Sequence, residues 1–283
     1  MSGKTCIVTG ASAGIGTATA VGLARRGASL ALVGRDRKRL QAAADECLAS
    51  GAPAVQVFAC DFSELNNVRV LAESLLEALP RIDVLVNNAA LVLQHREETV
   101  DGYEKVFAVN HLAPYLLTRL LLDRLVASAP ARIVNVASDA YTFGQLEPDD
   151  YMSTGSYRPL KVYGRSKLAN ILFTVELAAR LDGTGVTANC LHPGFVSTSL
   201  GRDNKLGLLF VKLASPFIKS PADGASTVLH LACDDVTVTG EYFVSSKPRP
   251  TKGYAKDRAM ATRLWDDSAA LVVAHLDGLA DGT

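Results

Sequence analysis

Residues 4–16, KTCIVTGASAGIG, determine the fold of this chain. They begin with an apolar, β-branched run that stops at Gly10, and Gly14 and Gly16 then open an alanine-rich helix. This order predicts a strand, a glycine turn and a helix. Glycines let the backbone approach a pyrophosphate at a helix N-terminus, where free N–H groups and the helix dipole favour negative charge. We therefore expect a dinucleotide to bind at this turn.

Strands and helices alternate along the rest of the chain. The expected strands are residues 4–9, 29–33, 54–59, 82–86, 132–137, 186–191 and 241–244. The expected helices are residues 14 to about 26, 64–79, 103–127, 168–181 and 222–231. A parallel sheet covered on both faces is the economical solution for such an order. The predicted fold is α/β, a single-domain Rossmann-type doubly wound sheet of about seven parallel strands with helices on both faces.

The composition changes little before residue 247, which predicts one main domain. Residues 1–246 are expected to form a Rossmann-type dinucleotide-binding and catalytic domain. Residues 247–250, KPRP, predict a linker to a C-terminal helix at 256–275. We expect residues 247–283 to pack on the same domain, through apolar side chains of this helix. These side chains are Leu264, Trp265, Leu271 and Val272.

Charge and cysteine content limit the classes of function. Lys and Arg together number 29, as do Asp and Glu, so the balance offers no electrostatic footprint for nucleic acid. The five cysteines are widely spaced without a Cys-x-x-Cys pair, and the five histidines are scattered, so we expect no metal site. A strand begins almost at Met1, which predicts a cytoplasmic protein without an integral membrane segment. The expected partner is a small molecule.

Arg35 follows the second expected strand about twenty residues after the glycine turn, where such a fold contacts the adenosine ribose. An acidic residue at this position would bind the ribose hydroxyls, whereas an arginine can pair with a 2′-phosphate. Arg35 therefore favours NADP(H) over NAD(H). The alternative is a solvated arginine that starts the next helix beside Arg37, Lys38 and Arg39.

Polar residues follow three further strands, at the sheet edge where doubly wound sheets bind ligands. Asp61 follows the third strand and could accept a hydrogen bond from an adenine amino group. Asn87 and Asn88 follow the fourth strand, and Ser138 follows the fifth. Each residue taken singly is also an ordinary turn residue. Their occurrence at successive strand ends indicates a ligand site.

Tyr163 and Lys167 lie four residues apart on an expected helix, so they share one face. At contact distance and an effective dielectric constant near 20, the ammonium would favour phenolate by roughly 4 kcal/mol. This would lower the tyrosine pKa by about three units, to near 7, where it can exchange a proton with a carbonyl or alcohol. The alternative is an exposed amphipathic pair without chemistry.

These motifs, in their order, resemble the short-chain dehydrogenase/reductase family over essentially the whole chain. The matching elements are Thr9-Gly10-x-x-x-Gly14-Ile15-Gly16, Asp61, Asn87-Asn88-Ala89, Asn110, Ser138, Tyr163-x-x-x-Lys167 and Pro193-Gly194. Within the family the chain is most similar to the retinol dehydrogenase branch. The segments that carry this likeness are Val109-Asn110-His111-Leu112, Ser166-Lys167-Leu168-Ala169-Asn170, Leu191-His192-Pro193-Gly194 and Arg263-Leu264-Trp265.

The resemblance implies a catalytic tetrad. Tyr163 would be the general acid/base, and Lys167 would lower its pKa and hold the nicotinamide ribose. Ser138 would bind the substrate oxygen, and Asn110 would hold a water that connects Lys167 to solvent. The implied cofactor-binding residues are Gly10, Ser12, Gly14, Ile15, Gly16, Arg35, Asp61, Phe62, Asn88, Ala89, Tyr163, Lys167, Pro193, Gly194, Val196 and Thr198.

A segment at about 197–220 corresponds to the family's substrate lid. Its densely apolar run, residues 206–218, is too short to span a bilayer. Two interpretations remain open: a lid over an apolar substrate, or a patch that rests on a membrane or partner. The neutral charge of the chain favours the lid, with Leu209 and Phe210 against the substrate.

The predicted function is that of an NADP(H)-dependent short-chain oxidoreductase that interconverts a carbonyl and an alcohol on a bulky hydrophobic molecule. One alternative uses the same site for isomerisation, dehydration or cyclisation, and another is a non-catalytic NADP-binding regulator. The resemblance also implies a homodimer or homotetramer that pairs through helices at residues 112–127 and 168–181.

Overall fold

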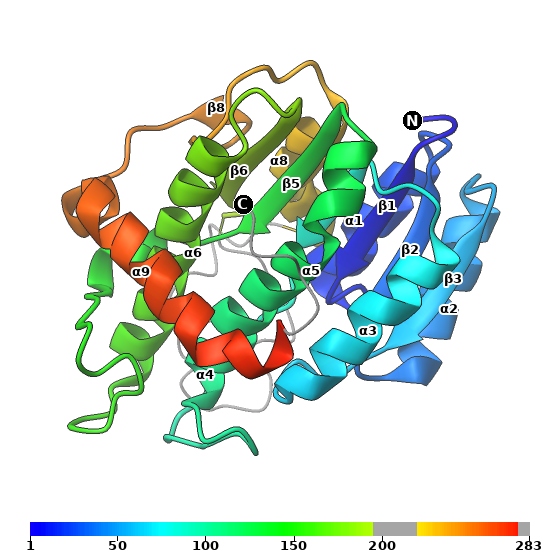
Figure 1. Ribbon diagram of the computed structural model, residues 1–283. Coiled ribbons are helices and arrows are strands. Elements are labelled where there is room, and N and C mark those ends of the chain that lie inside the picture. Colours follow the sequence, from blue (N-terminus) through cyan, green and yellow to red (C-terminus); the bar gives the residue numbers. More distant parts are fainter. Residues whose placement is uncertain (195–219, 277–283) are drawn as a thin grey trace.

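The computed structural model describes residues 1–194 and 220–276 of the chain (Figure 1). Its centre is one sheet with the strand order β3-β2-β1-β4-β5-β6-β7-β8. The strands are β1 (Thr5–Thr9), β2 (Ser29–Gly34), β3 (Val55–Ala59), β4 (Val84–Asn87), β5 (Ala131–Val136), β6 (Val186–His192), β7 (Tyr242–Val244) and β8 (Lys247–Pro248). The predicted α/β doubly wound sheet is confirmed.

The sheet has eight strands in the described residues, where about seven were predicted. Neighbouring strands from β3 to β7 are parallel, and β8 pairs antiparallel with β7. Residues 247–250 were predicted as a linker, but Lys247 and Pro248 extend the sheet edge instead. A two-residue strand that contains proline is possible there because an edge strand needs few backbone donors.

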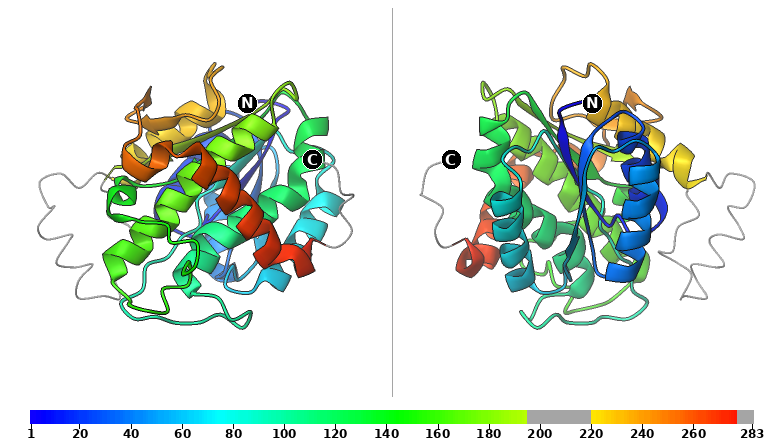
Figure 2. Two further views of the ribbon diagram at one scale, coloured as in Figure 1. Left: turned by 60° about the vertical axis from the view of Figure 1, so that its left-hand side comes forward. Right: turned by 90° about the vertical axis from the view of Figure 1, so that its right-hand side faces the viewer.

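Helices cover both faces of the sheet (Figure 2). They are α1 (Gly14–Ala24), α2 (Arg37–Ala49), α3 (Leu65–Ala78), α4 (Lys105–Phe107), α5 (Ala113–Ala127), α6 (Pro159–Arg180), α8 (Pro221–Cys233) and α9 (Arg258–Val272). Side chains of α1, α2 and α8 form one hydrophobic core with the sheet, and side chains of α3, α5, α6 and α9 form the other. Within β1, Ile7 points into one core while Cys6 and Val8 point into the other. A strand buried on both faces is apolar at nearly every position, as this one is.

The helix predicted at 103–127 is interrupted. Residues Ala108–Leu112 form a π-helical segment between α4 and α5. Pro114 explains part of this break, because it has no N–H to donate to the carbonyl of Asn110 four residues earlier. π-Helical turns of this kind are frequent at functional sites. The interruption contains Asn110, one of the predicted catalytic residues.

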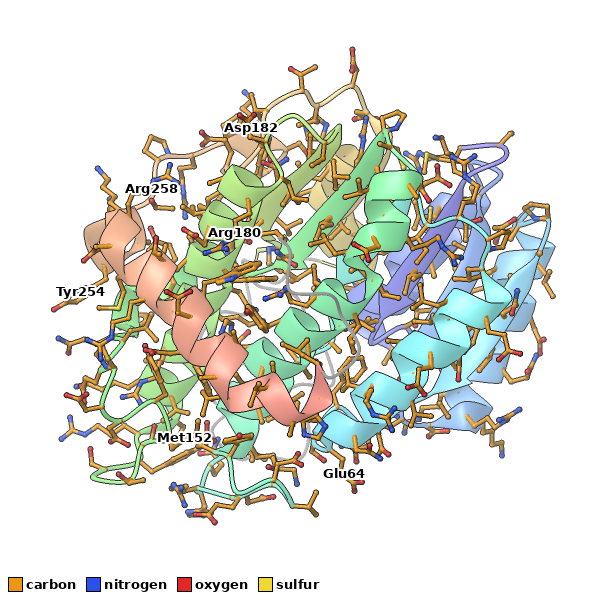
Figure 3. All side chains as sticks on the ribbon, in the orientation of Figure 1. Glu64, Met152, Arg180, Asp182, Tyr254 and Arg258 are labelled. Atoms are coloured by element: carbon orange, nitrogen blue, oxygen red, sulfur yellow. The ribbon has the colours of Figure 1, made fainter. Side chains whose placement is uncertain are left out.

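The C-terminal helix α9 packs across α5 and α6 (Figure 1). Trp265 is buried against the rings of Tyr115 on α5 and Phe173 on α6. Figure 3 shows Arg180 at the end of α6 beside α9, and its guanidinium lies 4.5 Å from the centroid of the Trp265 ring. The predicted core contacts of Leu264 and Val272 are confirmed, and Leu271 is partly buried.

The position of α9 limits how two copies of the chain could pair through the predicted helices. The helices proposed to pair, α5 and α6, carry α9 over the face that they share. Any pairing through that face would have to include α9 or displace it. The oligomeric state therefore stays a prediction.

Three chemical features complete the description. All five cysteines are free thiols, and every one except Cys233 is fully buried. Over residues 1–194 and 220–276, no group of three His, Cys, Asp or Glu side chains could hold a metal ion. In the same residues no helix combines the length and the apolar character that crossing a bilayer requires.

Candidate active site

The candidate site lies at the carboxyl ends of the parallel strands, where the strand order reverses. The chain passes from β1 outward to β2 and β3, and then returns to β4 on the other side of β1. This topology opens a crevice between β1 and β4, at which doubly wound folds bind ligands. The glycine turn that begins at Gly10 follows β1, and Asn88 follows β4.

Both the backbone conformation of this turn and the lack of room for a side chain require glycine. Gly10 and Gly14 have φ angles of 66° and 59°, in the left-handed region that favours glycine. A Cβ atom on Gly16 would lie 2.1 Å from the carbonyl oxygen of Gly10. The backbone of the turn therefore packs directly against itself. Without side chains in the way, its N–H groups can come close to a phosphate.

Thr9 and Asn88 lock the turn to the end of β4. The Thr9 hydroxyl accepts hydrogen bonds from the backbone N–H of Asn88 at 2.9 Å and of Ala89 at 3.0 Å. The Asn88 amide donates in return to the Thr9 carbonyl at 2.8 Å. The Asn88 side chain, predicted to bind cofactor, is thus used to hold the turn. Thr9 was not singled out as a site residue, although its place at the end of the strand was a signal.

The N-terminus of α1 fits a pyrophosphate. Its N-cap residue, Ala13, makes no side-chain hydrogen bond to the first turn, and that turn contains no acidic residue. By contrast, Asp36 caps α2 by accepting from the N–H of Arg39, and Ser220 caps α8. The free N–H groups and the helix dipole of α1 can accept a negative charge. The residues present therefore fit the phosphates of a dinucleotide.

Arg35 is placed as an adenosine-binding residue would be. It is exposed directly after β2 and makes no hydrogen bond or ion pair with another residue of the described part of the chain. The Ser12 hydroxyl lies close by, since a Cβ built on Gly34 would be 3.4 Å from it. The helix α2 begins only at Arg37. Ser12 thus lies beside Gly34, the residue that precedes Arg35.

Asp61 and Phe62 follow β3 and differ from each other in environment. One carboxylate oxygen of Asp61 accepts from the backbone N–H and the hydroxyl of Ser63, at 2.9 and 2.8 Å. The Phe62 side chain is buried in the hydrophobic core, so its predicted role cannot involve the ring. An aromatic side chain gains more from burial in the core than from contact with a solvated cofactor edge. Only the backbone of Phe62 could contact a ligand.

Ser138 and Tyr163 come from different elements and meet at the site. Ser138 follows β5 and begins a short 3-10 helix, where its hydroxyl accepts from the N–H of Ala140 at 3.2 Å. Tyr163 lies in the second turn of α6, which starts at Pro159. Ser138 lies close enough to Tyr163 for a side-chain hydrogen bond that lowers the pKa of the phenol. The structure thus brings together the two residues predicted to bind one substrate oxygen.

Lys167 lies beneath Tyr163 on the same face of α6. Its ammonium donates to the carbonyl of Val136 at 2.9 Å and lies 5.5 Å from the centroid of the Tyr163 ring. The side chain is only 2% exposed, and this burial lowers the pKa of Lys167 to about 8. The predicted proximity of the two residues is confirmed.

The structure does not show the predicted fall in the pKa of Tyr163. Burial raises the pKa of Tyr163 to about 12, and the hydrogen bond with Ser138 only partly opposes this. The earlier expectation included the attraction of Lys167 but omitted the cost of removing a phenolate from water. The ammonium of Lys167 is also directed to a carbonyl rather than to the phenol oxygen.

Asn110 is tied to the site through Ser166. Its amide donates to the Ser166 hydroxyl at 3.0 Å and to the Leu91 carbonyl at 2.9 Å, and its oxygen accepts from the Leu91 N–H at 2.8 Å. The Ser166 hydroxyl donates to the carbonyl of Tyr163 at 2.8 Å. Ser166 thus links the π-helical segment to the helix that carries Tyr163 and Lys167. Ser166 belongs to the sequence motif around Lys167 but was not predicted as a site residue.

A charged cluster behind Ser138 was also missed. The Asp139 carboxylate accepts hydrogen bonds from the Tyr242 hydroxyl at 2.6 Å and from Arg249. The backbone N–H of Asp139 donates to Nδ1 of His192 at 3.2 Å. Burial would raise the pKa of Asp139, but these partners hold it below its usual value. The partners come from three distant segments, so no local pattern in the sequence could have revealed them.

The remaining predicted residues lie at the end of β6 or beyond it. Pro193 and Gly194 directly follow β6, and Gly194 has a φ angle of 88°. Val196, Thr198, Leu209 and Phe210 lie outside the described residues. Their roles stay predictions.

Comparison with known proteins identifies the family. A family model described as short chain dehydrogenase matches residues 4–207. Retinol dehydrogenase 14 of Mus musculus is 44% identical over 289 residues, which cover 96% of this chain and 86% of that protein. A proposed daunorubicin C-13 ketoreductase, DnrU, of Streptomyces sp. (strain C5) is 41% identical over 95% of this chain and 93% of its own.

A solved structure supports the same conclusion. The RhlG/NADP active-site complex of Pseudomonas aeruginosa has a TM-score of 0.70 and 27% identity, over 86% of this chain and 94% of that chain. The glycine turn, the site residues and the relatives agree. This chain belongs to the short-chain dehydrogenase family, in its retinol dehydrogenase branch.

Proposed function

We propose that this protein is an NADP(H)-dependent oxidoreductase that interconverts a carbonyl and an alcohol on a bulky hydrophobic small molecule. The observation that supports this best is that Ser138 lies close to Tyr163, whose ring lies beside the buried Lys167. Two hydroxyls that converge on one point can bind the oxygen of a carbonyl, and one of them can donate a proton to it.

In this proposal each residue has one task. Tyr163, whose pKa of about 12 keeps it protonated at neutral pH, donates its proton to the carbonyl oxygen. Ser138 holds that oxygen in place, and the ammonium of Lys167 stabilises the phenolate that remains. The nicotinamide cofactor supplies the hydride. Asn110 supports the helix of Tyr163 through Ser166.

The choice of NADP(H) rests on Arg35 and Ser12. A 2′-phosphate needs a positive group and a hydroxyl that are free to turn toward it. Arg35 meets this condition, because it has no hydrogen-bond or ion-pair partner among the described residues, and Ser12 lies beside the preceding Gly34. An RhlG/NADP complex among the related structures is consistent with this choice.

The substrate class rests on the relatives and on the sequence of the predicted lid. Relatives named for retinol and for a daunorubicin ketone point to large apolar alcohols and ketones. Leu209 and Phe210 of the apolar run at 206–218 would contact such a substrate. A cytoplasmic location is part of the same proposal.

The test is to incubate purified protein with NADPH and a panel of hydrophobic ketones while following cofactor absorbance. Net oxidation of NADPH with formation of the alcohol supports the proposal. A changed product without cofactor oxidation would instead indicate isomerisation, dehydration or cyclisation. Cofactor binding without any product would indicate a regulator.

Tyr163→Phe is the control for this assay. The variant should keep its affinity for cofactor, because the ring packs without its hydroxyl, and lose turnover by a factor of about 10² to 10⁴. Turnover close to that of the parent protein would assign Tyr163 a purely structural role and reject the mechanism.

A further inference from the structure

Two glycines bring the two halves of the active site into backbone contact. Gly164 directly follows Tyr163 on α6 and lies against residues 138–144, which we call the Ser138 turn. A Cβ atom built on Gly164 would lie 2.5 Å from the carbonyl oxygen of Ala140 and 2.8 Å from the N atom of Gly144. Because both are backbone atoms, neither can rotate away.

The contact is reciprocal. A Cβ atom built on Gly144 would lie 2.4 Å from the carbonyl carbon and oxygen of Gly164, and 2.6 Å from the N atom of Arg165. Neither partner can accept even a methyl group without a shift of the other segment.

Backbone conformation does not explain these glycines. Gly144 has a φ angle of −82°, which any residue can adopt. Gly164 lies within a 22-residue helix, where glycine is less favourable than alanine. The close approach of the two segments is the remaining reason for both residues.

The contact reaches Ser138 through Ala140. The N–H of Ala140 donates to the Ser138 hydroxyl, and the carbonyl of Ala140 is the atom nearest to Gly164. A methyl group on Gly164 would have to push that carbonyl away by about 1 Å to reach the ordinary contact distance of 3.4 Å. Ser138 would move with it, away from Tyr163.

We propose that the Gly144–Gly164 contact is a positioning device that fixes the distance between the hydroxyls of Ser138 and Tyr163. The inference rests on the proposed function, because it assumes that both hydroxyls bind one substrate oxygen. The two glycines touch no substrate; they act through the segments that carry the reacting groups.

The first test compares Gly164→Ala, Gly144→Ala and a matched control, Gly155→Ala. Gly155 lies in the loop before α6, and a Cβ there would have 3.9 Å to its nearest neighbour. A displacement of about 1 Å can reduce turnover up to about a hundredfold. We expect Gly164→Ala and Gly144→Ala to lower kcat/KM for a ketone by about tenfold to a hundredfold, with the Kd for NADPH unchanged within about twofold. Gly155→Ala should behave as the parent protein.

A double-mutant cycle with Ser138→Ala shows whether the effect passes through Ser138. If it does, adding Gly164→Ala to Ser138→Ala should cost less than about twofold, because the hydroxyl that it displaces is already absent. Full additivity of the two losses would overturn the inference. So would a Gly164→Ala variant that fails to fold or loses NADPH affinity along with turnover, since the contact would then be only structural. An unchanged rate in Ser138→Ala alone would reject the proposed function itself.

Discussion

At the scale of single residues, Lys167 combines a charge with nearly complete burial. Its pKa is lowered to about 8 in the folded protein, against about 10.4 in an unfolded chain. Between these values the unfolded chain binds more protons than the folded one, so the Lys167 contribution to stability rises with pH. Below about pH 8 the folded protein bears the full cost of the buried charge.

Lys167→Met should remove this cost. The free energy of unfolding of the variant minus that of the parent protein should be largest near pH 7. This difference should fall by roughly 2 kcal/mol by about pH 9.5. The absolute difference also includes the Val136 carbonyl, which loses its donor. Urea unfolding at the two pH values measures the change.

Lys161→Met, at an exposed position of the same helix, is the control and should show no such trend. A pH-independent difference for Lys167→Met would mean that the pKa of Lys167 is not lowered in the folded protein.

Arg35 gives the second prediction at this scale. Its expected contact with a 2′-phosphate is charge-assisted and worth about 1.5 to 3 kcal/mol, so kcat/KM should favour NADPH over NADH by at least about tenfold. Arg35→Ala should erase most of this preference. Arg37→Ala removes an equally exposed charge from the first turn of α2 and should keep it. Equal efficiency with both cofactors in the parent protein would refute the assignment.

At the scale of elements, α9 is attached to the π-helical segment that contains Asn110. Ser268 on α9 hydrogen-bonds the buried His111 at 2.8 Å, and Tyr103 donates to the Leu271 carbonyl at 2.6 Å. Both residues of the first pair are completely buried. The C-terminal helix therefore supports the catalytic side of the sheet, although it is remote in sequence.

Ser268→Ala should lower the free energy of unfolding by about 1 to 3 kcal/mol, because it leaves a ring nitrogen of His111 buried without that partner. Urea unfolding at neutral pH measures the loss. Ser226→Ala on α8 is the control, since that serine is exposed and bonds only within its own helix. Alanine is the better helix former, so helix propensity alone would raise stability in both variants. A loss of the same size in both variants would mean that it does not depend on the buried contact with His111.

The elements themselves could largely be predicted from the sequence, whereas the edge strand and the contacts between distant segments could not. The strand, turn and helix at residues 4–24 follow from glycine conformation and a β-branched run, which are local properties. The break at Asn110 had a local signal in Pro114 that the predicted long helix disregarded. The strand β8 depends on pairing with β7, which no property of two residues can reveal. The cluster around Asp139 likewise depends on contacts between distant segments.

At the scale of the whole molecule, the two helical layers leave the carboxyl edge of the sheet as the place where the predicted site residues of the described part of the chain lie. The glycine turn, Ser12 and Arg35 follow β1 and β2 at this edge, while Ser138 follows β5 and Tyr163 lies on α6. The predicted lid, at about 197–220, follows shortly after β6, which ends at His192. The lid composition should then decide which substrates are accepted.

Leu209→Asp or Phe210→Asp tests this relation between lid and substrate. The burial of a leucine-sized side chain against a ligand is worth about 1.5 to 3 kcal/mol, so either change should raise KM for a bulky hydrophobic ketone by about tenfold or more. A small ketone, which cannot reach the lid, should be affected little, and the ratio of the two KM values measures the effect. Val238→Asp is the control, because Val238 is an exposed apolar residue before β7 and its change should alter neither KM. Equal losses for both ketones would indicate unfolding, and no loss for either would remove this segment from the substrate site.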